Sequence, residues 1–132
     1  MNNLEISEIV VAKIISQLLE NGLEPKTLRE SDFGIDKEHL GFVYTSIKWL
    51  ESEAIIYVEE IHRGTEANVV ILVNPALTSK GFNILGQNFL GRPGTETIAT
   101  AVQTVARENR SYAGIGDFVG GILGGFTKSI GS

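Results

Sequence analysis

The residues that could act as acids, bases or metal ligands are few and scattered along the 132-residue chain. There is no cysteine, so a disulfide framework and a thiolate metal site are both excluded. His39 and His62 lie far apart in the sequence, and we expect them at the surface or at helix ends. Asp32, Asp36 and Glu38 are close enough to suggest a cation site, but helix caps explain them better. With no nucleophile–base pair and no phosphate loop, the sequence predicts no catalytic site, no metal and no cofactor.

Composition and charge set limits on the class of protein. The charged fraction of 20% and the hydrophobic fraction of 42% are typical of a soluble globular protein. The first residues do not form a secretory signal, so the expected location is the cytoplasm. Residues 1–90 carry 13 acids against 7 bases, while residues 91–132 carry 3 acids against 4 bases. An acidic body of this kind disfavours non-specific binding to nucleic acid.

The elements that position these residues begin with a helix over Leu4–Glu20. Its apolar side chains cover about half of the helical wheel, which predicts contact with two neighbouring elements. Gly22 supplies the left-handed residue that ends the helix. Pro25 then opens a short second helix over about residues 26–33, and Gly34 ends it.

The central stretch predicts a long helix followed by a hairpin. Asp36 is the expected N-cap of a helix over residues 36–53. The helix carries a core stripe at helical spacing: Leu40, Val43, Tyr44, Ile47 and Leu50. Residues 54–61 are rich in β-branched and aromatic side chains, so they predict a strand. A polar tip over residues 62–68 leads to the returning strand, residues 69–73.

Two further helices complete the chain. The pair Asn74-Pro75 predicts the start of a helix that fades near residue 86. Residues 91–94, Gly-Arg-Pro-Gly, mark the expected boundary between a domain over residues 4–90 and an extension over residues 91–132. The extension opens with a helix of small residues from Thr95 to about Asn109.

The order of these elements resembles a winged helix-turn-helix domain of small bacterial or phage-type proteins. Residues 47–56, Ile-Lys-Trp-Leu-Glu-Ser-Glu-Ala-Ile-Ile, look like the end of a recognition helix that enters the first strand of the wing. Residues 77–82, Leu-Thr-Ser-Lys-Gly-Phe, are similar to the start of the helix that follows the wing. The resemblance covers about residues 4–90. It implies a mainly α fold with a small β wing, here with a C-terminal helical extension.

In that family the exposed face of the third helix usually reads the DNA major groove. The residues that this chain offers for such contacts are Lys37 and Lys48 on the helix and Arg63 at the tip. Acidic residues surround them, and a protein that reads DNA normally brings more cations to the phosphates. Sequence-specific DNA binding as a dimer is therefore an alternative function rather than the leading one.

An aromatic face of the central helix is the leading candidate site. Phe42 and Trp49 lie seven residues apart, which places them two turns apart on one face, with Thr45 between them. This face is either a contact surface for a protein partner or a second copy, or a surface that the hairpin or closing helix covers as ordinary core.

The last segment, residues 112–132, is rich in glycine with interleaved large apolar residues. Its small residues recur every four positions, a spacing that lets two helices approach closely. The candidate association residues are Gly116, Gly120, Gly121, Gly124, Gly125, Phe118, Leu123 and Phe126. Three roles stay open: helix packing in an oligomer, a loosely docked arm, and contact with a membrane surface.

Taken together, the sequence favours a non-enzymatic regulatory or adaptor module that acts through protein contacts and self-association. The alternatives are a dimeric DNA-binding transcriptional regulator and a membrane-associating effector that uses the glycine-rich tail. No small-molecule substrate is indicated.

Overall fold

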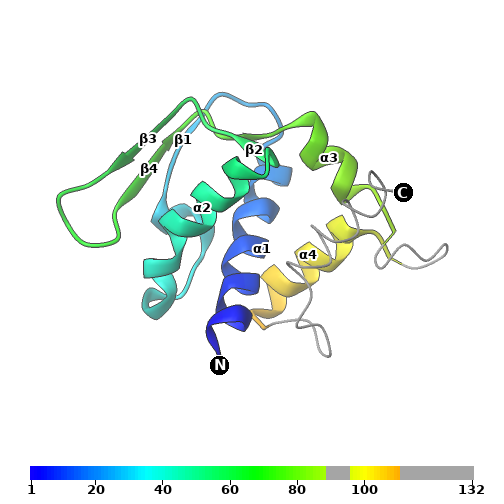
Figure 1. Cartoon of the computed structure of the whole chain (residues 1–132), viewed down its shortest axis with the longest axis horizontal. Helices are drawn as coiled ribbons and strands as arrows, with labels where there is room; N and C mark the ends of the chain where they lie inside the picture. The colour runs from blue at the N-terminus through cyan, green and yellow to red at the C-terminus, as the bar shows by residue number, and fades with distance from the viewer. Residues whose placement is uncertain (89–95, 111–132) are drawn as a thin grey trace.

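The computed structural model describes residues 1–88 and 96–110 (Figure 1). This part of the chain contains four α-helices, two 3-10 helices and two small antiparallel sheets, so the predicted α+β class is confirmed. The α-helices are α1 (Asn3–Asn21), α2 (Val43–Ser52), α3 (Ser79–Leu85) and α4 (Ile98–Glu108). The 3-10 helices are η1 (Glu30–Phe33) and η2 (Lys37–Phe42).

Helix α1 forms the centre of the described structure, between α2 and α4 (Figure 1). The Asn2 side chain accepts a hydrogen bond from the Glu5 N–H at 2.9 Å and caps the helix. Gly22, at a φ of 58°, ends it by donating its N–H to the Leu18 carbonyl. Every residue from Glu8 to Ile15 is buried. The prediction that this helix contacts two neighbours is therefore confirmed.

The predicted second helix is wrong in its first half. Thr27–Arg29 form strand β1 instead, which pairs antiparallel with β4 (Val70–Val73). The buried Leu28 lies opposite Leu72, so the pairing adds an apolar side chain to the core. Only η1 remains helical, and Gly34 in the left-handed conformation ends it as predicted.

The central helix is shorter than predicted, because residues 37–42 form the 3-10 helix η2 before α2 begins. Asp36 does not cap it with its side chain, so that prediction is wrong. The Asp36 carboxylate instead accepts a hydrogen bond from Asn109 Nδ2 at 3.0 Å. The core stripe is confirmed in its main part, since three of its members are fully buried: Val43, Ile47 and Leu50.

The predicted strand over residues 54–61 is two strands in two sheets. Ala54 has a φ of 58°, which prevents a strand from starting there. Strand β2 (Ile56–Tyr57) pairs with β5 (Ala76–Leu77). Strand β3 (Glu60–Arg63) pairs with β4, which gives the strand order β1-β4-β3. The β3–β4 hairpin extends away from α4, and its tip is shorter than predicted.

The prediction that a helix starts at Asn74-Pro75 is wrong, because that helix begins later in the chain. Asn74 adopts a φ of 50°, and its side-chain oxygen accepts a hydrogen bond from the Lys26 N–H at 3.0 Å. These contacts hold Asn74 beside β1, and the chain continues as β5 rather than as a helix. Helix α3 begins only at Ser79, where Thr78 Oγ1 accepts a hydrogen bond from the Gly81 N–H at 3.0 Å.

The helix predicted over residues 95–109 is confirmed as α4, but it begins later than predicted, at Ile98, with Thr97 as N-cap and Asn109 as a left-handed C-cap. Its apolar face joins the same core as α1 and α2 through Ile98, Ala101, Val102 and Val105. The predicted boundary at residues 91–94 and the glycine-rich tail lie outside the described residues. Within the described residues, every helix is too short or too polar to span a bilayer.

Candidate functional site

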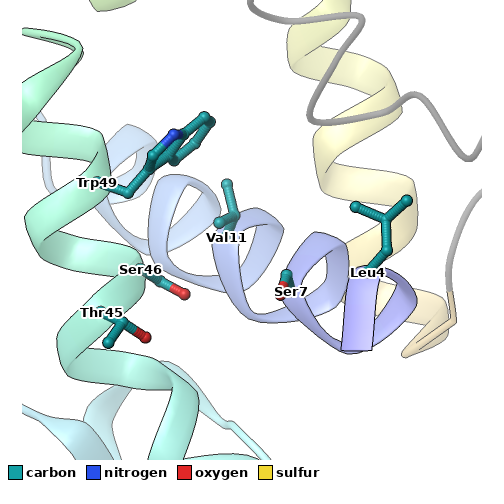
Figure 2. Close-up of a pocket in the computed structure, with 6 residues that line it drawn as sticks. All are labelled: Leu4, Ser7, Val11, Thr45, Ser46 and Trp49. Carbon is teal, nitrogen blue, oxygen red and sulfur yellow. The ribbon is translucent and has the colours of Figure 1, made fainter. Parts of the chain in front are cut away.

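A groove lies between α1 and α2, with a volume of about 270 Å³ (Figure 2). Helix α1 contributes one wall and α2 the other. The lining residues are Leu4, Ser7, Val11, Thr45, Ser46 and Trp49. Apolar atoms make up most of the lining surface and none of the six side chains is charged, so the groove is suited to bind an apolar group rather than a charged one.

Helical spacing explains how these side chains come together. Leu4, Ser7 and Val11 follow the i, i+3, i+7 pattern, so they share one face of α1. Thr45 and Trp49 are four residues apart and share one face of α2. Figure 2 shows that Trp49 projects from α2 toward the groove above α1, while Leu4 lies at the other end.

Exposure defines the floor and the open end of the groove. Val11 is 2% exposed, whereas Leu4 is 47% exposed. The indole of Trp49 is half-buried and packs against the core with its inner part. Thr45 is exposed. An apolar ligand entering beside Leu4 would therefore contact Val11 below and Trp49 at the side.

Two of the three predicted partner-binding residues line this groove, namely Thr45 and Trp49. Phe42 lies at the end of η2, is half-buried against the core, and is not among the groove-lining residues. Leu4, Ser7 and Val11 could not be selected from the sequence, because the apolar arc of α1 is too wide to show which of its faces borders a groove.

The residues predicted for nucleic-acid binding are mostly engaged within the chain. Lys48 Nζ lies 3.3 Å from the Glu51 carboxylate. The Arg63 guanidinium lies over the Tyr44 ring, 4.2 Å from its centroid, which joins β3 to α2. Lys37 is exposed on η2. Two of these three cations therefore already have a partner that a phosphate would have to replace.

The two histidines differ in burial. Of the two positions expected for His39, the surface is wrong, because the side chain is 9% exposed, whereas a place at a helix end agrees with its position in the last turn of η2. It is buried because η2 turns it inward, and its Nδ1 has no hydrogen-bond partner in the described part of the chain. His62 is exposed on β3, 3.8 Å from the Glu60 carboxylate.

The acidic cluster is divided among separate structural contacts. Asp32 accepts a hydrogen bond from the Arg29 N–H at 2.8 Å, in a capping role at η1. The hydrogen bond from Asn109 is the main cause that holds the pKa of Asp36 below its ordinary value of 3.8; burial opposes this effect, and the Lys13 ammonium adds to it. Across residues 1–88 and 96–110, no three His, Asp or Glu side chains are placed to hold a metal ion.

Comparison with known proteins does not assign this chain to a family. No family model matches it, and no significant match is found among curated proteins or solved structures. A function must therefore be inferred from the geometry of the chain's own residues.

Proposed function

We propose that this protein is a non-enzymatic adaptor or regulatory module that binds a protein partner through the groove between α1 and α2. The observation that carries this proposal is the position of Trp49 at the edge of an apolar groove that ends at the exposed Leu4. Tryptophan is enriched among the residues that dominate protein–protein binding energy.

The dimensions of the groove suggest what it accepts. Leu4 and Val11 are two helical turns apart, or about 10 Å along the axis. A groove of about 270 Å³ has room for one or two large apolar side chains rather than for a whole helix. The partner we propose is therefore an amphipathic helix that inserts one or two leucine or phenylalanine side chains.

The winged-helix interpretation belongs to the same proposal. The order of α1, β1, the 3-10 helices, α2, the β3–β4 hairpin and α3 supports it, as does the pairing of β1 with β4. DNA binding has less support, because Lys48 and Arg63 are engaged by Glu51 and Tyr44.

Self-association through residues 112–132 is also proposed, and light scattering on the full chain and on a version ending at Asn109 tests it.

The partner-binding proposal is tested with peptide ligands selected against the full chain from an unbiased displayed library. We expect selected peptides to carry paired leucine or aromatic residues at helical spacing. The Trp49→Ser variant should lose about 30-fold in affinity, the change expected when a central interface tryptophan is removed. Tyr57→Ser is the matched control, because Tyr57 is an exposed aromatic residue that does not line the groove.

Two results would count against this function. If peptides bind Trp49→Ser as tightly as they bind the unmodified chain, the groove is not the binding surface. If Trp49→Ser lowers the free energy of unfolding by more than about 3 kcal/mol, the ring acts as core instead.

A further inference from the structure

A second hollow lies on the α4 side of α1 and has a polar lining. It has a volume of about 420 Å³ and is bounded by α1, by the end of η1 and by α4. The residues that matter for its chemistry are Lys13, Ser16, Glu20, Gly34, Gln103 and Arg107. The groove that contains Trp49 shares none of these residues.

Lys13 is the unusual member of this set, because it is a lysine whose side chain is only 9% exposed. Its ammonium donates one hydrogen bond to the Gly34 carbonyl at 2.9 Å. The nearest carboxylate oxygen, on Asp36, lies 4.0 Å away, which is too far for a hydrogen bond. An ammonium has three donors, so two lack an acceptor within the described residues. An anion oxygen in the hollow that Lys13 lines would add an acceptor for this ammonium.

Arg107 brings a second cation to the same hollow from α4. It is exposed and, within residues 1–88 and 96–110, has no ion pair or hydrogen bond through its side chain. The other described arginines each have a partner: Arg29 with Glu30, Arg63 with Tyr44, and Arg110 with Glu108. Ser16 and Gln103 add neutral donors to the lining.

We propose that this hollow binds a small carboxylate or phosphate anion between the Lys13 ammonium and the Arg107 guanidinium. Two acids limit the charge that it can accept, since Glu20 lines the hollow and Asp36 lies beside Lys13. With two cations near two acids, a singly charged anion fits better than a highly charged one. Because the cations lie on α1 and on α4, a bound anion would hold these two helices together.

The test is an amide NMR titration of the full chain with sodium acetate and, separately, with sodium phosphate. Sodium chloride at equal ionic strength is the reference. We expect saturable shifts at Gly34 and Gln103 with a dissociation constant of roughly 1 mM. The arm with the tighter binding identifies the anion as a carboxylate or a phosphate.

Variants at exposed positions keep this test independent of folding. Arg107→Gln should weaken binding about fivefold or more, because one charge-assisted contact is lost. Arg110→Gln removes an equal charge three residues away, outside the hollow, and should leave the affinity unchanged. Lys13→Met is less informative alone, since Lys13 also holds the Gly34 carbonyl.

The absence of saturable shifts with both anions would overturn the proposal. An equal loss of affinity in Arg107→Gln and Arg110→Gln would also overturn it, because that pattern reports general charge rather than a site. Trp49→Ser should bind the anion normally, so failure here is separable from failure of the peptide-binding proposal.

Discussion

Replacing Gly81 with alanine tests the close packing of α3 on Ile55, in the segment between α2 and β2. Gly81 lies in the first turn of α3, directly against the backbone of Ile55. A Cβ atom at this position would lie well under 3.0 Å from the Ile55 carbonyl oxygen and 3.3 Å from its carbonyl carbon. Real Cβ atoms do not approach this closely, so either α3 or the Ile55 backbone must move.

Neither of them can move without losing other contacts. The Ile55 carbonyl accepts hydrogen bonds from the Thr78 N–H at 3.0 Å and from Thr78 Oγ1 at 3.1 Å. Ile55 is 1% exposed and leads directly into β2, which is paired with β5. A shift of α3 would instead expose Ile84 and Leu85, which are buried in the core.

The expected cost is the balance of three effects. Overpacking costs about 1–3 kcal/mol, and a weakened backbone hydrogen bond costs about 1 kcal/mol more. Alanine returns about 1 kcal/mol because it favours the helix over glycine. We therefore expect Gly81→Ala to lower the free energy of unfolding by about 2 kcal/mol, equivalent to roughly 8 °C in Tm.

Urea denaturation followed by circular dichroism measures this change, and Gly86→Ala is the matched control. Gly86 has a φ of −80°, and its Cβ would lie 3.5 Å from the nearest atom, the Phe82 carbonyl oxygen. Alanine at residue 86 should therefore be neutral or slightly stabilising. If Gly81→Ala is as stable as Gly86→Ala, α3 does not pack on the Ile55 backbone as described.

Three further substitutions test other contacts. Glu30→Ala should lower the free energy of unfolding, measured by urea denaturation, by about 1–3 kcal/mol, because the buried Glu30 carboxylate accepts a hydrogen bond from the Val70 N–H at 2.9 Å. An unchanged urea midpoint would contradict this. The pKa of Asp36 is lowered in the folded state, mainly by Asn109, so its stabilisation is complete above about pH 4 and is lost as pH falls through the folded-state pKa. The free energy of unfolding of Asp36→Asn should therefore fall less steeply below about pH 4 than that of the unmodified chain. Ala54→Gly should stabilise the protein by up to about 1 kcal/mol, because Ala54 has a φ of 58°; a destabilised variant would refute that backbone conformation.

The helices that the sequence predicted best are those with both a periodic apolar face and a recognisable end. Helix α1 ends where Gly22 was expected to end it, and α4 ends at Asn109 as expected. Both signals act locally, since a cap bonds to the first or last turn of its own helix. Local signals of this kind can be read from sequence alone.

The errors arise where a distant partner decides the local structure. Strand β1 has three residues, too few to show a period, and it exists because β4 pairs with it. Asn74 was expected to cap a helix, but its side chain accepts a hydrogen bond from Lys26, 48 residues earlier in the chain. The run from Ala54 to Ile61 is rich in β-branched and aromatic residues, yet it is divided between two sheets with different partners.

The candidate sites also depend on residues that are distant in the sequence, and Lys13 is the clearest example. A lysine within the apolar run from Val10 to Ile15 is ordinarily expected at the solvent-facing side of a helix. In the fold it is buried, as is every residue of α1 from Glu8 to Ile15, and its ammonium donates a hydrogen bond to the Gly34 carbonyl. Asp36 lies beside the same ammonium and accepts a hydrogen bond from Asn109 at the end of α4. These contacts join α1, η2 and α4 through three side chains that are far apart in sequence, so the polar hollow beside them is a property of the tertiary structure alone.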